Sequence, residues 1–125
     1  MSGEGSSFRY VIKAAGRRLF EIEYDGYMPA DDSHVLETER LVVAQPEPVG
    51  LYYQVHGFSG FHRSQIMTHA DMFGRLGPRV VGIAVVGARP VVRFGAITIS
   101  LMAKTPLKTF DDRREAMAWL VSLLR

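Results

Sequence analysis

The most constraining feature of this sequence is the run Val80 to Val86, which contains only apolar side chains and one glycine. Successive side chains of a strand point to opposite faces of its sheet, so a strand of this composition must be covered on both faces. A central strand of a parallel sheet, with helices packed on both sides, meets that requirement. The run therefore predicts an α/β protein.

A different pattern stands earlier in the chain. Apolar side chains recur at every second position over residues 8–14 and again over residues 20–24, which is the period of a strand with one buried face. The connection Ala15-Gly16-Arg17 is short and contains glycine, as is typical of a β-hairpin. We expect the sheet to begin with this hairpin.

Helices and strands alternate in the rest of the chain. Asp31 and Asp32 offer capping oxygens to a first helix, and Asp112 and Glu115 have the spacing of a capping box for the last one. The predicted elements are a helix over 33–44, a strand over 51–55, a helix over 62–76, the strand over 80–86, a helix from Pro90, a strand over 107–110 and a closing helix. The order β-β-α-β-α-β-α-β-α predicts a mixed sheet with helices packed on it.

Two of these segments carry specific expectations. The segment Gly57-Phe58-Ser59-Gly60 is predicted to be a turn after the third strand, with Ser59 either a plain cap of the following helix or a phosphorylation site there. In the helix that follows Pro90, the side chains of Phe94, Ile97 and Leu101 are predicted to form the buried stripe.

Composition limits the class of protein. The chain has 125 residues, a net charge of +2 with its basic residues scattered among acids, and no cysteine. It carries no apolar stretch of the roughly 20 residues that a membrane helix needs. We therefore expect residues 1–7 to form a disordered tail, residues 8–125 to form a single cytoplasmic domain, and neither nucleic acid nor a disulfide to be involved.

The C-terminal third carries a family resemblance. The segment from Arg79 to Gly87 is similar to a family strand that ends in a Val-Val-Gly turn. Phe110-Asp111-Asp112, Glu115-Ala116 and Ala118-Trp119-Leu120 match a closing pattern of the same family. With the order of elements, these motifs resemble the STAS fold of bacterial anti-sigma-factor antagonists, and most closely the SpoIIAA-like family, also grouped as STAS/SEC14-type domains.

The resemblance implies a regulatory module. STAS antagonists carry a phosphorylatable serine in an Asp-Ser-Ser-Gly-type turn after the third strand. The corresponding residues here are Gly57-Phe58-Ser59-Gly60, in which Phe58 takes the place of the phosphorylated serine and Ser59 matches its neighbour. For the SpoIIAA-like family, the resemblance implies binding of a lipid-like or other apolar ligand, or contact with a regulatory protein.

No pattern in the sequence indicates catalysis or a cofactor. There is no Gly-x-Ser-x-Gly elbow, no His-Glu-x-x-His and no Walker motif. His62 and His69 are seven residues apart on one predicted helix, about 10 Å at 1.5 Å per residue, so one metal ion cannot bridge them. The segment Gly87 to Pro90 suits a solvated helix start better than a nucleotide site. We expect a non-enzymatic protein.

Our leading hypothesis is a non-enzymatic regulatory module that binds either a lipid-like apolar small molecule or a regulatory protein. Aromatic and methionine side chains crowd around the second and third predicted helices, where they could line a cavity or form a homodimer face. The candidate ligand-binding residues are Phe58, Phe61, Arg63, Met67, Arg89 and Phe94. The apolar members would line the pocket, while Arg63 and Arg89 would meet an anionic headgroup. The alternative is a phosphorylation-controlled partner switch with Ser59 as the acceptor.

Overall fold

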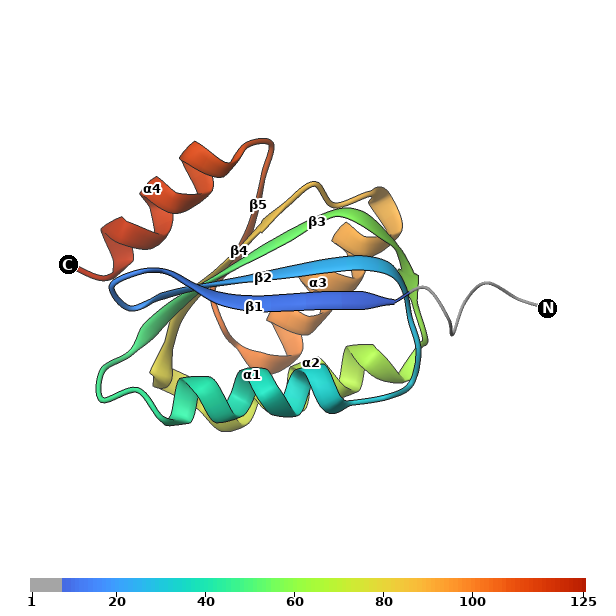
Figure 1. Cartoon of the computed structure of the whole chain (residues 1–125), viewed down its shortest axis with the longest axis horizontal. Coiled ribbons are helices and arrows are strands. Elements are labelled where there is room, and N and C mark those ends of the chain that lie inside the picture. The colour runs from blue at the N-terminus through green and yellow to red at the C-terminus, as the bar shows by residue number, and fades with distance from the viewer. Residues whose placement is uncertain (1–7) are drawn as a thin grey trace.

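The computed structural model describes residues 8–125, and the expected tail over residues 1–7 lies outside them (Figure 1). A short 3₁₀ turn spans Gly77–Arg79. The strands and helices are β1 (Arg9–Gly16), β2 (Leu19–Met28), α1 (Ser33–Val43), β3 (Val49–Phe61), α2 (Ser64–Leu76), β4 (Val80–Val86), α3 (Pro90–Ala103), β5 (Leu107–Phe110) and α4 (Arg113–Leu123). The predicted order of elements is confirmed.

The five strands found within residues 8–125 form one mixed sheet in the order β1-β2-β3-β4-β5. β1 and β2 are antiparallel, with Tyr10 opposite Tyr24 and Ile12 opposite Ile22, and every later pair is parallel. The hairpin turns at Arg17 and Arg18, and Arg18 has the left-handed φ of 63° that such tight turns use. The sheet therefore begins with the predicted hairpin.

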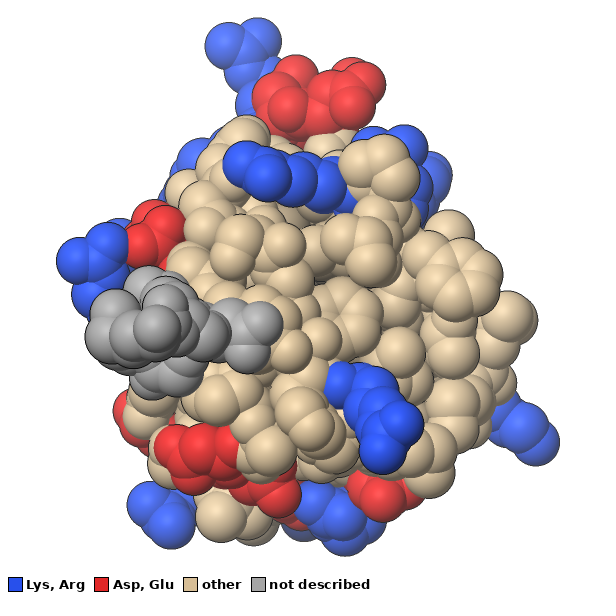
Figure 2. All heavy atoms as spheres, turned by 90° about the vertical axis from the view of Figure 1, so that its right-hand side faces the viewer, with Lys and Arg blue, Asp and Glu red and all other residues tan. Residues whose placement is uncertain are grey.

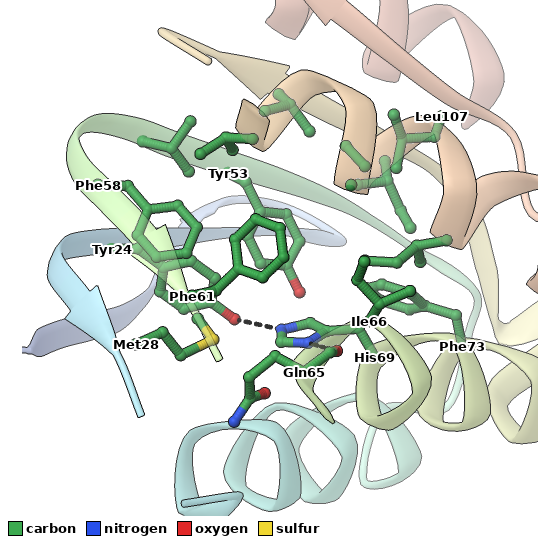
Figure 3. A pocket seen from close by; sticks show the side chains of 17 residues that line it. Tyr24, Met28, Tyr53, Phe58, Phe61, Gln65, Ile66, His69, Phe73 and Leu107 are labelled. Atoms are coloured by element: carbon green, nitrogen blue, oxygen red, sulfur yellow. Dashed lines mark hydrogen bonds between the residues drawn. The ribbon is translucent and has the colours of Figure 1, made fainter. Parts of the chain in front are cut away.

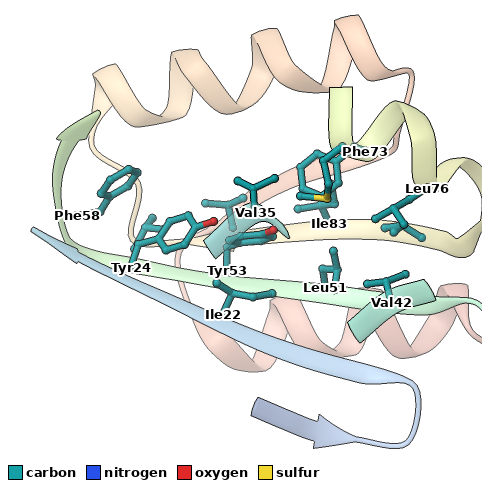
Figure 4. Close-up of a cluster of buried hydrophobic side chains, with 14 of the residues drawn as sticks. Ile22, Tyr24, Val35, Val42, Leu51, Tyr53, Phe58, Phe73, Leu76 and Ile83 are labelled. Atoms are coloured by element: carbon teal, nitrogen blue, oxygen red, sulfur yellow. The ribbon is translucent and has the colours of Figure 1, made fainter. Parts of the chain in front are cut away.

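Among the helices of the described residues, α1, α2 and α3 cover one face of the sheet and α4 covers the other. Buried side chains of β2, β3 and β4 pack against α1, α2 and α3 in a large apolar cluster (Figure 4). A smaller cluster beneath α4 consists of Leu19, Tyr52, Ala84, Val86, Ala116 and Leu120. β4 contributes to both clusters, since Ile83 and Val85 face the first and Ala84 and Val86 the second. This confirms the expectation that the apolar run is a central, doubly covered strand.

α4 lies close against the sheet because its sequence provides a cap and a small contact residue. The Asp112 carboxylate accepts a hydrogen bond from the Glu115 backbone N–H at 2.9 Å, as the capping box predicts. Beneath the helix, a Cβ atom at Gly82 would lie 2.6 Å from Cδ1 of Leu123 and 3.1 Å from the Trp119 ring. A side chain at this position of β4 would displace Leu123 and Trp119, so the glycine lets α4 pack closely on the sheet.

The predicted turn at 57–60 is wrong. β3 continues through this segment to Phe61, and its last residues pair with the end of β2, where Gly26 lies opposite Phe58 and Met28 opposite Phe61. The pairing shifts register between Gly26 and Tyr27, and glycine in a strand commonly marks such a bulge rather than a turn. Because β2 also extends to Met28, the segment has a partner strand that local sequence could not reveal.

The predicted buried stripe of α3 is also wrong. Phe94, Ile97 and Leu101 are exposed, with Phe94 71% and Leu101 75% accessible. Val92 and Gly95 face the core instead. A Cβ atom at Gly95 would lie 2.9 Å from the tip of the Phe61 ring, so the glycine lets α3 approach the end of β3. Since α3 is apolar nearly all round, its period alone could not indicate which stripe is buried.

Candidate functional site: an apolar pocket with a buried tyrosine and histidine cluster

The sheet, α2 and α3 enclose a pocket at the end of the molecule where β2 and β3 finish (Figure 3). Its cavity volume is about 70 Å³. Phe58 and Phe61 reach it from the bulged end of β3, and Val92 and Gly95 face it from α3. The bulged strand and the close approach of α3 at Gly95 thus build this wall of the pocket.

Polar side chains meet at the α2 side of the pocket. The Tyr24 hydroxyl lies 3.0 Å from Nε2 of His69, and Nδ1 of His69 lies 2.8 Å from the backbone carbonyl oxygen of Gln65 (Figure 3). A carbonyl oxygen can only accept, so Nδ1 of His69 carries the proton and Nε2 accepts one from Tyr24. Tyr53 and His34 pack beside this chain of hydrogen bonds, with ring centroids 5.5 Å from that of Tyr24.

Burial keeps this tyrosine and histidine cluster (Tyr24, His34, Tyr53, Gln65 and His69) uncharged at neutral pH. Burial lowers the pKa of His34 and of His69 from 6.5 to about 4. It also raises the pKa of the Tyr24 and Tyr53 hydroxyls above the ordinary value of 10. Within residues 8–125, the pocket lining includes no Asp, Glu, Lys or Arg side chain. The interior of the pocket is therefore neutral.

Several polar atoms of the cluster remain unpaired within the described part of the chain. They are the Tyr53 hydroxyl, which lies near that of Tyr24, and Nε2 of His34 and Oε1 of Gln65, which lie near each other; neither pair has the geometry of a hydrogen bond. The other end of the Gln65 amide is occupied, because Nε2 donates to the carbonyl oxygens of Pro29 at 2.7 Å and Asp31 at 2.9 Å. Buried polar atoms without partners are uncommon in native proteins, so this group differs from an ordinary core.

Of the residues predicted from sequence, Phe58 and Phe61 line the pocket. Met67 and Phe94 lie on the outer sides of α2 and α3, half or more exposed, and do not contribute to its lining. Arg63 and Arg89 are exposed and precede the first residues of α2 and α3. The structure therefore brings two of the six candidate ligand-binding residues together in one cavity.

Ser59 is exposed in the bulged part of β3 and stands five residues before the first residue of α2. It does not cap that helix, so the plain-cap interpretation is wrong. The residue before α2 is Arg63, and the Ser64 backbone N–H donates to Nδ1 of His62 instead. The reason is that β3 is longer, and α2 begins later, than the local pattern indicated.

Sequence reasoning missed the polar half of the site. Tyr53 lies within the predicted strand over 51–55, and His69 shares a helical face with Phe73. The sequence at both positions is therefore consistent with ordinary core residues. The spacing of Ile66, His69 and Phe73 does mark one face of α2. No local signal indicates that Tyr24, 45 residues away from His69, meets that face.

The surface at this end of the molecule is mostly uncharged. Figure 2 shows a broad area of other residues, with Lys, Arg, Asp and Glu side chains chiefly around it. Along α3, the exposed apolar side chains are those of Val91, Phe94, Ile97, Leu101 and Met102, which we term the α3 outer face. Over residues 8–125 there is no cluster of three or more potential metal ligands, and no helix is long and apolar enough to span a membrane.

Comparison with known proteins decides the family. A family model described as SpoIIAA-like matches residues 19–121. The chain belongs to the SpoIIAA-like family. This confirms the resemblance drawn from the C-terminal third, and the match also includes the hairpin strand β2, the pocket and the tyrosine and histidine cluster. No curated protein matches this SpoIIAA-like chain.

Solved structures agree with this fold. An uncharacterized protein with a SpoIIAA-like fold from Shewanella loihica is similar with a TM-score of 0.73 and 14% identity, over 96% of this chain and 98% of the other. An anti-sigma factor antagonist from Mycobacterium paratuberculosis is similar with a TM-score of 0.63 and 16% identity, over 94% of this chain and 97% of the other. At these identities the likeness establishes the fold alone.

Proposed function

We propose that this SpoIIAA-like protein is a non-enzymatic regulatory module that binds a small apolar molecule in the pocket between the sheet, α2 and α3. The observation that carries the proposal is the cavity of about 70 Å³, lined by uncharged side chains. Protein interiors are normally packed without voids larger than a water molecule. An apolar pocket of this kind is suited to a small apolar ligand.

The arrangement of the polar groups favours binding over catalysis. His69 is the side chain of the pocket best suited to act as a base, yet both of its ring nitrogens have fixed partners in Tyr24 and the Gln65 carbonyl oxygen. Burial also holds the pKa of His69 at about 4, far below the value near 7 that suits a general base at neutral pH. His69 is therefore a structural group in this proposal.

A regulatory protein partner is the second part of the proposal. It is supported by the fold likeness to a protein described as an anti-sigma factor antagonist. The α3 outer face is our candidate contact surface for such a partner, because exposed contiguous apolar side chains commonly mark protein contacts.

The Ser59 partner switch is a separate candidate, favoured by one observation. Ser59 is exposed, and Phe58 and Phe61 on either side of it line the pocket. A phosphate on Ser59 would add charge beside the apolar lining. Treatment with a serine kinase, followed by mass mapping in the parent chain and in Ser59→Ala, tests this candidate.

Native mass spectrometry and xenon binding test the proposed ligand function. We expect the gently purified protein to carry a noncovalent mass that disappears on denaturation, and xenon to shift the NMR signals of the pocket lining. Ala96→Leu places a larger side chain in the pocket and should weaken both effects. Ala118→Leu makes the same change on exposed α4 and should weaken neither. A bare chain whose NMR signals do not respond to xenon would overturn the proposal.

Arg63 and Arg89 are retained as candidate contacts for an anionic headgroup outside the pocket. Both are exposed and precede the first turns of helices that border it. The double substitution Arg63→Gln with Arg89→Gln should weaken binding of an anionic ligand and leave xenon binding unchanged.

A further inference from the structure

The Tyr53 side chain carries the one unpaired hydroxyl among the described residues that line the pocket. Tyr53 is 5% exposed, and Figure 3 shows its hydroxyl directed from β3 toward His69, into the pocket. A phenol has one proton to donate, and a buried donor without an acceptor is unfavourable. An occupant of the cavity that accepts this proton would remove that penalty.

The neighbouring polar groups cannot donate a hydrogen bond to a ligand, because their protons are already donated to other protein atoms. Tyr24 donates its proton to Nε2 of His69, and His69 donates from Nδ1 to the Gln65 carbonyl oxygen. The Gln65 amide nitrogen is bonded to two further carbonyl oxygens. Tyr53 is thus the one donor of the described pocket lining that is available to a ligand.

An ion does not suit this position. The described lining holds no Lys or Arg to pair with a carboxylate and no Asp or Glu to pair with an ammonium group. A buried ion without a partner is strongly disfavoured, and a neutral His69 supplies no compensating charge. The ligand group beside Tyr53 must therefore be polar and uncharged.

From these observations we infer that the pocket selects an apolar ligand whose buried end is uncharged and carries a carbonyl or hydroxyl oxygen, bound by the Tyr53 hydroxyl. This rests on the proposed function and adds the chemical class of the ligand. The pocket is partly open, so its cavity of about 70 Å³ admits one end of a small ring or of a short chain. Tyr53 is the specificity-determining residue, and the remaining lining supplies shape.

Two probes of nearly the same shape test the inference, cyclopentanone and cyclopentane, because they differ in the carbonyl oxygen. Their affinities are measured by NMR titration with the parent chain and with Tyr53→Phe, which removes the hydroxyl alone. We expect cyclopentanone to lose about tenfold in affinity in the variant, the ordinary effect of one hydrogen bond, and cyclopentane to lose nothing. Tyr52→Phe is the control, because Tyr52 faces α4 on the opposite side of the sheet, and it should change neither affinity.

The outcomes separate the inference from the proposed function. If cyclopentane binds in the pocket and Tyr53→Phe changes both affinities equally or neither, the inference is overturned and the apolar pocket remains. If neither probe shifts the signals of lining residues, the proposed ligand function fails, and the inference fails with it. Tighter binding of cyclopentanecarboxylate than of cyclopentanone would overturn the requirement for an uncharged group beside Tyr53.

Discussion

The two faces of the sheet are built from the same strands and differ in how they are filled. Beneath α4, Gly82, Ala116 and Leu120 bring helix and strands into close contact. Beneath α2 and α3, the neighbouring residues of the same strands border a cavity and a cluster of polar rings. Adjacent residues illustrate the contrast, since Tyr52 lies under α4 with the Arg113 guanidinium 5.0 Å above its ring, while Tyr53 faces the pocket.

The contrast indicates a division of roles between the two faces of the sheet. Dense packing contributes most to stability, since buried methylene groups and their contacts supply the favourable term. A cavity and unpaired polar atoms lower stability, and such features are commonly retained where a ligand binds. On this interpretation the α4 face is packed for stability alone, whereas the α2 and α3 face combines the larger apolar cluster with the binding site. The following predictions test that division, from the largest expected effect to the smallest.

The pocket face should make the protein acid-sensitive. His34 and His69 have pKa values of about 4 in the folded state and 6.5 in the unfolded state, so the unfolded state binds more protons between these values. Stability should therefore fall as the pH decreases from 6.5 to 4, by on the order of 3 kcal/mol for each histidine, and the histidine contribution should level off below pH 4.

Urea denaturation at several pH values measures this loss. His34→Phe should reduce the slope between pH 6.5 and 4 by about half, because one of the two buried histidines is gone. His56→Gln changes an exposed histidine and should keep the full slope. A slope that persists undiminished in His34→Phe would show that other groups cause the acid sensitivity.

Truncation of an aliphatic side chain to alanine should lower the free energy of unfolding more under α4 than at the pocket. Leu120 is fully buried, and Leu120→Ala should lower the free energy of unfolding by about 3 kcal/mol, the usual cost of a new cavity. Ile66 borders an existing cavity and is partly exposed, so Ile66→Ala should cost about 1 kcal/mol. Chemical denaturation of both variants compares the two losses in the free energy of unfolding, and equal losses would contradict the proposed division.

The α4 cap and Ser59 provide a third comparison. Asp112→Ala removes the side-chain acceptor of the Glu115 N–H and should lower the free energy of unfolding by about 1 kcal/mol. Ser59→Ala should change it by less than about 0.5 kcal/mol, because the exposed serine caps no helix. A cost at Ser59 as large as that at Asp112 would restore the cap interpretation.

The smallest effect is expected at Tyr53. Because its hydroxyl is unpaired, Tyr53→Phe should leave the free energy of unfolding within about 0.5 kcal/mol of the parent value, or raise it slightly. Thermal and urea denaturation without ligand measure the change. A loss above about 1.5 kcal/mol would mean that the hydroxyl already contributes to the fold, which the ligand inference excludes.

The sequence by itself determined the order of the elements. Period-two alternation located the hairpin, the apolar run located the central strand β4, and Asp112 with Glu115 located the start of α4. Each of these signals is local, because side-chain direction, capping and turn conformation depend on neighbouring residues. The family motifs lie in the same locally ordered C-terminal third, which explains why the resemblance was readable there.

Only the tertiary structure decided the site. It paired the Gly57–Phe61 segment with β2, turned Phe94 and Leu101 outward on α3, and brought Tyr24 to His69 across 45 residues of sequence. Strand partners, the buried stripe of an all-apolar helix and the meeting of distant polar groups depend on how elements are placed relative to one another. A cavity is a property of that placement, because it forms where packed elements fail to fill the space between them.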